Sequence, residues 1–193
     1  MHKKIIFGIQ GGKGSFNEQA IMDYIQRHHI KNYHIKYLYT SGKVLNHIDS
    51  GDVDYGLFAI HNSIGGIVGE SVHAMSQHLF HIVEEFAIPI RHFLMKRKDV
   101  EVRELTTVTA HPQVLKQCVT TLDKKYPNLK QQSGKGDLVD TAAAARALAH
   151  GKLLKYSAIL GPKPLAQMYD FEIIDQDLQD DKENKTSFLL VRS

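Results

Sequence analysis

Short apolar runs alternate with amphipathic segments along the whole chain, and this alternation constrains the fold more than any other feature of the sequence. The apolar runs have the length and composition of buried strands, and the segments between them carry apolar residues at helical spacing. Such alternation predicts βαβ units, in which parallel strands form a sheet with helices on both faces. We therefore expect the α/β class, with strands at 4–9, 33–39, 55–60, 105–109, 156–160, 171–174 and 187–191 and an extended segment at 80–95.

Local signals predict where several helices begin. Ser15 and Glu18 have the spacing of a capping box, in which a hydroxyl and a carboxylate bond the first amides of a helix. Pro112 suits the first position of another helix, whose apolar stripe would include Cys118 and Val119. Further helices are expected at 44–50, at 137–150 and from Pro162, and surface loops at 96–103 and 175–185.

The overall composition excludes several classes of protein. The 193 residues suffice for one domain or two small lobes, and 42% hydrophobic with 23% charged residues is typical of globular proteins. A net charge of +3 without a concentrated basic region argues against a nucleic-acid-binding protein. No apolar run approaches the roughly 20 residues of a membrane span, and the run after Lys4 is too short for a secretory signal.

Cysteine and histidine usage points away from metal chemistry. Cys118 is the single cysteine, which rules out an internal disulfide and a thiolate cluster and fits a cytoplasmic protein. Its place on an apolar stripe favours core packing over nucleophilic catalysis. Among twelve histidines only His78 and His81 have a useful helical spacing, and no His-Glu-x-x-His motif occurs. We expect solvated histidines and neither a metal nor a cofactor.

Polar segments at 11–15, 61–63 and 110–113 directly follow predicted strands. Open α/β sheets bind ligands at the carboxyl ends of their strands, so these segments are the candidate site. The first is a glycine loop, but Lys13 is followed by Gly14, which breaks the phosphate-loop pattern, and the dinucleotide fingerprint is also absent. Two interpretations stay open for this loop: an anion site at a helix N-terminus, or a tight turn that needs glycine.

A series of short motifs follows in order along the chain. They are Gln10-Gly11 with residues 14–20, Asp54-Tyr55-Gly56 leading into Asn62-Ser63 and Gly66, Ala110-His111-Pro112-Gln113 with Gln117-Cys118, Asp140-Thr141-Ala142, and Asn184-x-Thr186-Ser187-Phe188. In this order they resemble the Gly-Pro-Glu-Gly-Thr-Phe-Ser-Glu-x-Ala, Glu-Asn-Ser, Ser-His-Pro-Gln-x-x-x-Gln-Cys, Ser-Thr-Ala and Asn-x-Thr-Arg-Phe motifs of the prephenate dehydratase catalytic domain. The likeness runs along nearly the whole chain.

The resemblance implies a two-lobed α/β fold similar to that of type II periplasmic binding proteins, with the active site in the cleft between lobes. One lobe would comprise residues 1–76 with 169–193 and the other residues 77–168, each with a small mixed or parallel sheet. Since the chain ends just after the segment of Thr186, we expect no phenylalanine-binding regulatory domain and no feedback inhibition by that route. The family also implies a homodimer or homotetramer.

The resemblance further implies a lyase of phenylalanine biosynthesis that converts prephenate to phenylpyruvate with loss of water and carbon dioxide. Prephenate is a dianion, so hydroxyl, amide and helix N-terminal donors should hold its carboxylates. A positioned hydroxyl can also donate a hydrogen bond to the departing oxygen. The implied catalytic residues are Thr186, Asn62 and Gln113. The implied substrate-binding residues are Ser15, His61, Ser63, His111, Thr141, Ala142, Ser187, Phe188 and Lys13.

Several positions depart from the family pattern. His61 replaces a glutamate, Ser187 replaces an arginine and Asp140 replaces a serine. Serine cannot copy the bidentate carboxylate binding of arginine, and we expect Lys13 and His61 to supply charge in its place. Two alternatives therefore stay open: a non-aromatising prephenate decarboxylase of a specialised pathway, and a non-catalytic module that binds a small carboxylate. Thr186 favours the dehydratase, because its hydroxyl matters only if water leaves.

Overall fold

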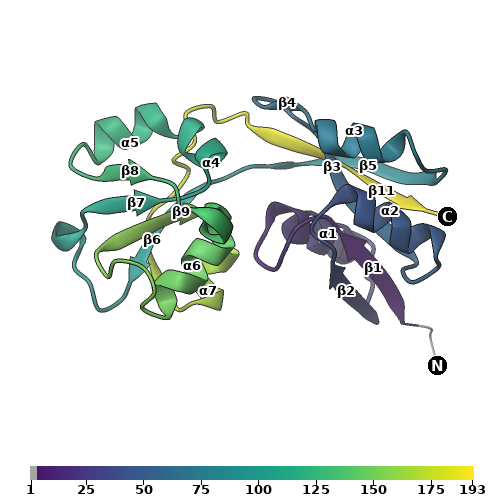
Figure 1. Ribbon diagram of the computed structural model, residues 1–193, viewed down its shortest axis with the longest axis horizontal. Helices are drawn as coiled ribbons and strands as arrows, with labels where there is room; N and C mark the ends of the chain where they lie inside the picture. Colours follow the sequence, from purple (N-terminus) through teal and green to yellow (C-terminus); the bar gives the residue numbers. More distant parts are fainter. Residues whose placement is uncertain (1–3) are drawn as a thin grey trace. The chain divides into compact units, whose positions relative to one another are not determined.

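The computed structural model describes residues 4–193, without the side chains of residues 137 and 139, and its strands and helices alternate as expected (Figure 1). The elements are β1 (Ile5–Ile9), α1 (Phe16–Arg27), β2 (Tyr33–Tyr37), α2 (Ser41–Asp49), β3 (Tyr55–Asn62), β4 (Gly66–Ile67), α3 (Gly69–Met75), β5 (His81–Pro89), β6 (Phe93–Arg97), β7 (Thr107–Thr109), α4 (Pro112–Lys116), α5 (Val119–Lys125), β8 (Lys130–Gln132), α6 (Thr141–Ala149), β9 (Ser157–Gly161), α7 (Pro164–Met168), β10 (Phe171–Asp175) and β11 (Lys185–Arg192). Short 3-10 turns lie at Val102–Glu104 and Gly136–Val139.

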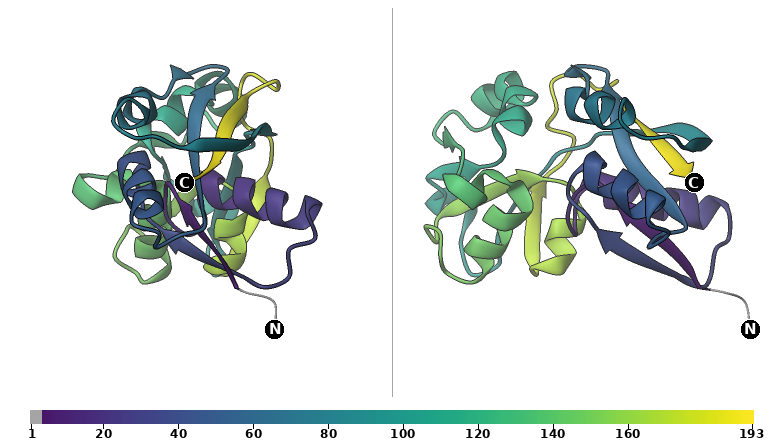
Figure 2. Two further views of the ribbon diagram at one scale, coloured as in Figure 1. Left: turned by 90° about the vertical axis from the view of Figure 1, so that its right-hand side faces the viewer. Right: turned by 45° about the vertical axis from the view of Figure 1, so that its right-hand side comes forward.

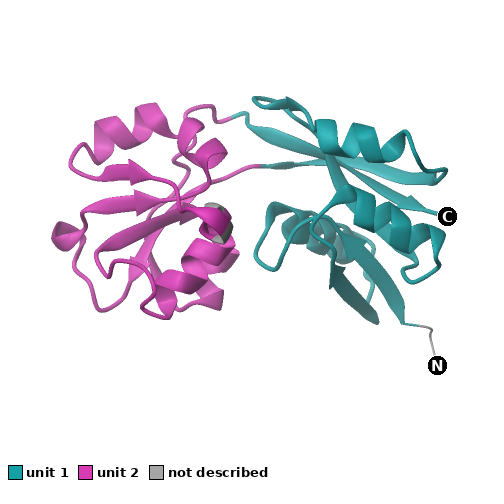
Figure 3. Ribbon diagram, in the orientation of Figure 1, with its two compact units in different colours: residues 1–89, 183–193 teal, residues 90–182 magenta. Residues whose placement is uncertain are grey.

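The chain divides into two compact units, coloured separately in Figure 3. Unit 1 comprises residues 1–89 and 183–193, and unit 2 comprises residues 90–182. The lobe boundaries expected from the sequence, at 76/77 and 168/169, lie earlier in the chain. The difference arises because β5 pairs with β11 and so belongs to unit 1, whereas β10 pairs with β6 and so belongs to unit 2.

Unit 1 contains a mixed sheet in the order β2-β1-β3-β11-β5, with β4 paired to β3. Strand β1 is parallel to both neighbours, and β11 is antiparallel to β3 and β5. Helix α1 covers one face, and α2 and α3 cover the other (Figure 2). The last strand of the chain therefore completes the sheet that the first strand begins.

Unit 2 contains a mixed sheet in the order β10-β6-β9-β7-β8. Successive residues of β6 and β9 point to opposite faces, so Leu94 and Leu160 enter one core cluster while Met95 and Ile159 enter the other. Helices α4 and α5 cover the first cluster, and α6 and α7 the second. Both units thus have the predicted class, α/β with a mixed sheet flanked by helices.

The single helix predicted after His111 is wrong, because the segment forms two helices, α4 and α5. The carbonyl of Gln117 accepts a hydrogen bond from the amide of Asp180 at 2.7 Å. The Asp180 carboxylate in turn accepts bonds from the amides of Thr120 and Thr121 at 3.0 and 2.8 Å. A residue distant in sequence therefore caps α5 and ends α4. The break leaves Val119 exposed, although Cys118 is buried in the core as predicted.

Other element predictions also need correction. The extended segment 80–95 is two strands, β5 and β6, in different units. The last predicted helix begins at Pro164 rather than Pro162, and the helix predicted at 137–150 consists of a 3-10 turn followed by α6. Both expected surface loops contain buried residues: Lys96, whose Nζ pairs with Glu172 Oε2 at 2.6 Å, and Gln179.

Candidate active site

The glycine loop after β1 is a tight turn closed by its own helix. Gly11 and Gly14 have φ values of 100° and 83°, a region that side chains disfavour. The Glu18 carboxylate accepts a hydrogen bond from the Gly14 amide at 2.6 Å, and Ser15 Oγ accepts one from the Glu18 amide at 3.3 Å. The predicted N-cap at Ser15 is therefore confirmed, but Glu18 binds the Gly14 amide rather than the Ser15 amide that a capping box uses. Because these donors are already used, the geometry favours the tight turn over a phosphate-type cradle.

Glu18 also holds the neighbouring strand. The Tyr37 hydroxyl donates a hydrogen bond to the Glu18 carboxylate. Burial raises the pKa of Tyr37, and the bond to Glu18 raises it further, so this hydroxyl stays protonated. Sequence reasoning assigned Glu18 to the helix cap alone. In the structure it ties the glycine loop, α1 and β2 together.

The ends of β3 and β11 carry the densest polar network of the predicted site residues. Asn62 Nδ2 lies 2.8 Å from Asn184 Oδ1, 2.9 Å from Thr186 Oγ1 and 3.1 Å from the Lys185 carbonyl. An amide has two hydrogens, so one of them is shared between acceptors. The Asn62 Oδ1 atom accepts bonds from the amides of Ile64 and Gly65 at 3.0 and 2.8 Å. This one side chain fixes the loop after β3 and the start of β11.

Ser63 forms a second connection between the end of β3 and the start of β11. Its Oγ accepts a hydrogen bond from the Lys185 amide at 2.9 Å, and its own amide donates to the Lys185 carbonyl at 2.9 Å. The half-buried Thr186 lies beside Asn62 in the strand register. Since Thr186 Oγ1 accepts from Asn62 and donates to no other residue between 4 and 193 in the structure, its hydrogen is available to a ligand.

The other predicted residues of β3 and β11 lie elsewhere. His61 is the register partner of Ser187, and alternation of side chains along a strand places both on the face opposite to Asn62 and Thr186. Phe188 is fully buried, with its ring centroid 6.2 Å from that of Phe86. The structure thus gathers Asn62, Ser63 and Thr186. It puts Phe188 in the core of unit 1, where it cannot contact a ligand.

A second group of predicted residues lies in unit 2, where β7 ends and α6 begins. The His111 amide donates a hydrogen bond to Thr141 Oγ1 at 2.9 Å, which links the N-termini of α4 and α6. His111 Nδ1 accepts a bond from the Gln113 amide at 3.1 Å, so the neutral ring carries its proton on Nε2. Thr141 is buried, whereas Gln113 is exposed and half-buried Ala142 packs on the core beneath α6.

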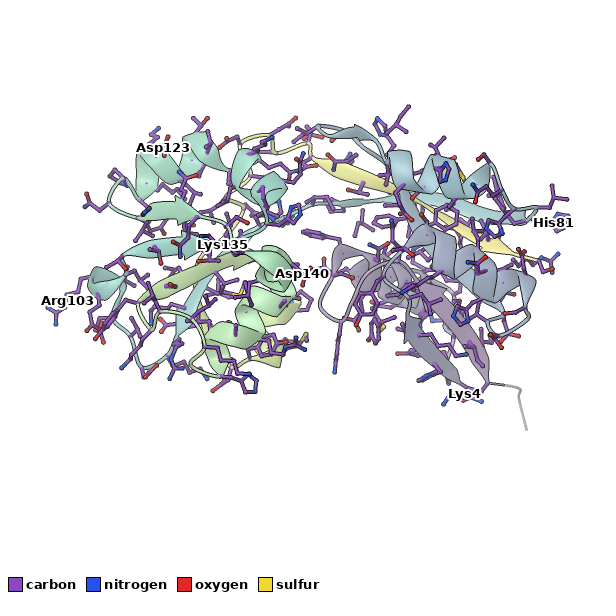
Figure 4. All side chains as sticks on the ribbon, in the orientation of Figure 1. Lys4, His81, Arg103, Asp123, Lys135 and Asp140 are labelled. Carbon is purple, nitrogen blue, oxygen red and sulfur yellow. The ribbon has the colours of Figure 1, made fainter. Side chains whose placement is uncertain are left out.

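Asp140 is the N-cap of α6, and its position at the start of that helix is labelled in Figure 4. Its carboxylate accepts a hydrogen bond from the Ala143 amide at 2.8 Å. The first turn of α6 therefore holds an acidic group at the position where the family resemblance expects a serine. An anion at a helix N-terminus is stabilised by the free amides there.

A hollow of about 490 Å³ lies in unit 2 beside α6, and its lining includes Ala143, whose amide donates to Asp140. None of the site residues predicted from the sequence is among the residues that line it, which are Lys135, Leu138, Ala143, Arg146, Ala147, His150 and Lys152. Lys135 is labelled in Figure 4.

The described part of the chain, residues 4–193, contains no cluster of histidine, cysteine or acidic side chains placed to hold a metal ion. Within the same residues, no helix has the length and hydropathy needed to cross a membrane. Burial raises the pKa of the Cys118 thiol to about 12, so it is not a reactive thiolate.

Two polar residues near the strand ends were missed by the sequence reasoning. Asn184 is buried against Asn62, and its place in the Asn-x-Thr motif was a usable signal. Glu70 binds Gln10 Nε2 at 2.7 Å through one oxygen and the Gly42 amide at 3.3 Å through the other. No local sequence pattern predicts these bonds of Glu70, because its partners come from the end of β1 and the start of α2.

Comparisons with known proteins match nearly the whole chain. A family model described as prephenate dehydratase matches residues 7–193. "Arogenate dehydratase/prephenate dehydratase 2, chloroplastic" of Arabidopsis thaliana is 34% identical over 139 residues, covering 72% of this chain and 35% of that protein. The "Bifunctional chorismate mutase/prephenate dehydratase" of Buchnera aphidicola is 28% identical over 192 residues, covering 96% of this chain and 46% of that protein. The chain thus spans between about a third and a half of the length of these relatives.

A solved structure supports the same fold. The crystal structure described as prephenate dehydratase in complex with L-Phe from Arthrobacter aurescens superposes with a TM-score of 0.84 at 23% sequence identity. The match covers 97% of this chain and 60% of that chain. At this level of identity the likeness concerns the fold alone.

Proposed function

Because the chain belongs to the prephenate dehydratase family, we propose that it is a lyase that converts prephenate to phenylpyruvate. The proposal rests on one observation above the others, the hydrogen bond of 2.9 Å from Asn62 Nδ2 to Thr186 Oγ1. Relatives are named for arogenate as well as for prephenate, so both substrates enter the test.

The chemistry requires little from the protein beyond orientation and one proton. The bond between the ring and its carboxylate breaks and releases carbon dioxide, and its electron pair moves through the diene. As this pair enters the ring, the ring–oxygen bond breaks, and the departing hydroxide takes up one proton, supplied in the end by solvent water, to become water. Since aromatisation drives the reaction, a hydrogen bond to the departing oxygen is the main contribution that a side chain can make.

Thr186 is suited to that contribution. Its Oγ1 accepts the amide bond of Asn62, which fixes the position of the oxygen and leaves its own hydrogen free to point at a ligand. A hydroxyl that accepts a hydrogen bond also becomes a stronger donor, because bonds in a chain polarise one another. In this proposal Thr186 donates to the departing oxygen and Asn62 holds it in place.

The unit 2 group is proposed to bind a carboxylate of the substrate. The Thr141 hydroxyl accepts from the His111 amide and can donate its own hydrogen. The neutral His111 ring offers an Nε2–H donor, since its Nδ1 is occupied by the Gln113 amide. These two donors, with the exposed Gln113 amide side chain, are suited to an anionic oxygen.

The two departures His61 and Ser187 are proposed to compensate each other. They replace a glutamate and an arginine of the family pattern, and they are register partners across β3 and β11. Opposite charges at directly opposed positions of a sheet attract. Replacing both residues therefore removes the whole ion pair and leaves no unpaired charge behind. On this view Ser187 need not bind substrate, and the loss of arginine does not disable the site around Thr186.

The test is product identification with the purified chain. Incubation with prephenate should give phenylpyruvate, and incubation with arogenate should give phenylalanine if that is the substrate. Release of a non-aromatic keto acid would instead identify a decarboxylase. Unchanged substrates together with a ligand-induced rise in Tm would identify a binding module, and either result would refute the proposal.

A further inference from the structure

Tyr39 combines two features that a structural residue rarely shows together. Its φ is +68°, in the left-handed region, and its side chain is 65% exposed. A non-glycine residue in this region carries backbone strain, which persists only where the surroundings impose it. Within residues 4–193 its hydroxyl has no hydrogen-bond partner and its ring stacks on no other ring. The side chain therefore contributes little that would offset the strain.

The neighbours of Tyr39 force this backbone conformation. The Thr40 amide donates to the Leu38 carbonyl at 2.8 Å, a three-residue turn centred on Tyr39. Leu38 is held on β1 by a bond of 2.9 Å from its amide to the Ile9 carbonyl, and Thr40 caps α2 through its bond to the Lys43 amide. With both neighbours fixed, position 39 must turn sharply, and glycine would suit it better than tyrosine.

The ring of Tyr39 lies over the glycine loop. A Cβ at Gly12 would lie 3.1 Å from Cε1 of Tyr39, closer than nine in ten such contacts, so the ring would have to shift by a few tenths of an ångström. Gly12 has no left-handed φ to explain its identity. Without a side chain at Gly12, the aromatic ring packs directly on the loop. The two residues together form a flat, exposed aromatic surface at the carboxyl ends of β1 and β2.

We propose that Tyr39 contacts the six-membered ring of the substrate and stacks on the aromatic ring of the product. The inference rests on the proposed function and extends it to a substrate-contacting residue outside the family motifs. Carboxyl ends of parallel strands are where an α/β sheet binds ligands, and a tyrosine face offers an unsaturated ring an apolar surface of matching shape. Because stacking suits a planar ring best, the contact strengthens as the substrate becomes aromatic.

The experiment measures binding and stability in parallel, with phenylpyruvate as the binding probe and prephenate or arogenate as the substrate. In Tyr39→Gly the strain is relieved and the ring is lost, so Tm should rise by about 1–3 °C. Both the KM and the Kd for phenylpyruvate should rise about 3- to 10-fold. Tyr39→Phe keeps the ring and should bind within 2-fold of the original chain.

His29 provides the matched control. It is exposed, has a φ of 53° and lies between α1 and the start of β2, whereas Tyr39 lies after the end of β2. His29→Gly should raise Tm in the same way without changing KM or Kd. Unchanged binding in Tyr39→Gly, or equal weakening in Tyr39→Phe, would overturn the inference while the lyase activity stands. An original chain that neither converts substrate nor binds phenylpyruvate would remove the proposed function as well.

Discussion

The two units hold their polar site residues in different ways. In unit 1, Asn62 joins the end of β3 to the start of β11, segments that lie 124 residues apart at the pair Asn62 and Thr186. In unit 2, the main bond joins the His111 backbone to Thr141, and helix caps supply the rest. Unit 1 thus fixes a hydroxyl through a network of side chains, whereas unit 2 presents donors at helix N-termini. We propose that the difference reflects separate tasks, a hydrogen bond to the departing oxygen from unit 1 and anion binding by unit 2.

The most severe test of this division is Thr186→Val, which removes the hydroxyl at nearly constant volume. If the hydroxyl assists the departing oxygen, kcat should fall about 10²- to 10⁴-fold with little change in KM. Thr186→Ser keeps the hydroxyl and should retain most of the activity. Equal kcat in the valine variant and the original chain would show that unit 1 has no proton-donating role.

Asn62→Ala should have the next largest effect, and on stability as well as activity. The change removes the bonds that hold the start of β11 and the loop after β3, and leaves the buried Asn184 without the bond from Asn62. A loss of about 2–3 kcal/mol in the free energy of unfolding is expected, measured by urea denaturation. Asn62→Asp keeps the acceptor for Ile64 and Gly65, so it should lose less stability while losing most activity.

Thr141→Val tests the polar residues of unit 2 and should have a smaller effect on stability than Asn62→Ala. Valine keeps the methyl group that packs near Gly161 but removes the acceptor for the His111 amide. We expect a loss of about 1 kcal/mol in stability and a higher KM at nearly unchanged kcat. A fall in kcat as large as that of Thr186→Val would contradict the separation of tasks between the units.

The smallest expected effect concerns pH and the buried His92 of unit 2. Burial lowers the pKa of His92, and the hydrogen bond with Gln117 only partly opposes this. In the unfolded chain the ring takes up a proton below a pH of about 6.5, whereas in the folded chain the lowered pKa shifts this protonation to a lower pH. The contribution of His92 to stability is therefore fully present above that pH and is lost as the pH falls below it. Between pH 7.5 and 5.5, the Tm of His92→Gln should fall by about 1–2 °C less than that of the original chain.

Local patterns in the sequence predicted several strands and the first helix well. Apolar runs identified β1, β3 and β9, and the Ser15–Glu18 spacing identified the start of α1. These features depend on neighbours within a few residues, so they are visible in a linear pattern. The motif resemblance placed Asn62 and Thr186 in one site, and the structure joins them by a hydrogen bond.

Features produced by distant contacts could not be predicted in this way. The break between α4 and α5 depends on Asp180, and the burial of Lys96 depends on Glu172. Phe188 was assigned to substrate binding because it belongs to a motif, but the register of β11 turns it into the core. Tyr39 was overlooked because strain at one residue leaves no periodic signal.

The position of β11 between β3 and β5 has a consequence for folding during synthesis. Unit 2 is complete once residue 182 has been made, but β5 has no partner in its sheet until β11 follows. At ribosomal rates the synthesis of residues 90–182 takes roughly 5–20 s, and during this time both edges of β5 are unpaired. Glu84 and Glu85 lie in this strand, and charges on an unpaired edge discourage pairing with other chains. The middle of the polypeptide can therefore mature on the ribosome before the region that precedes it.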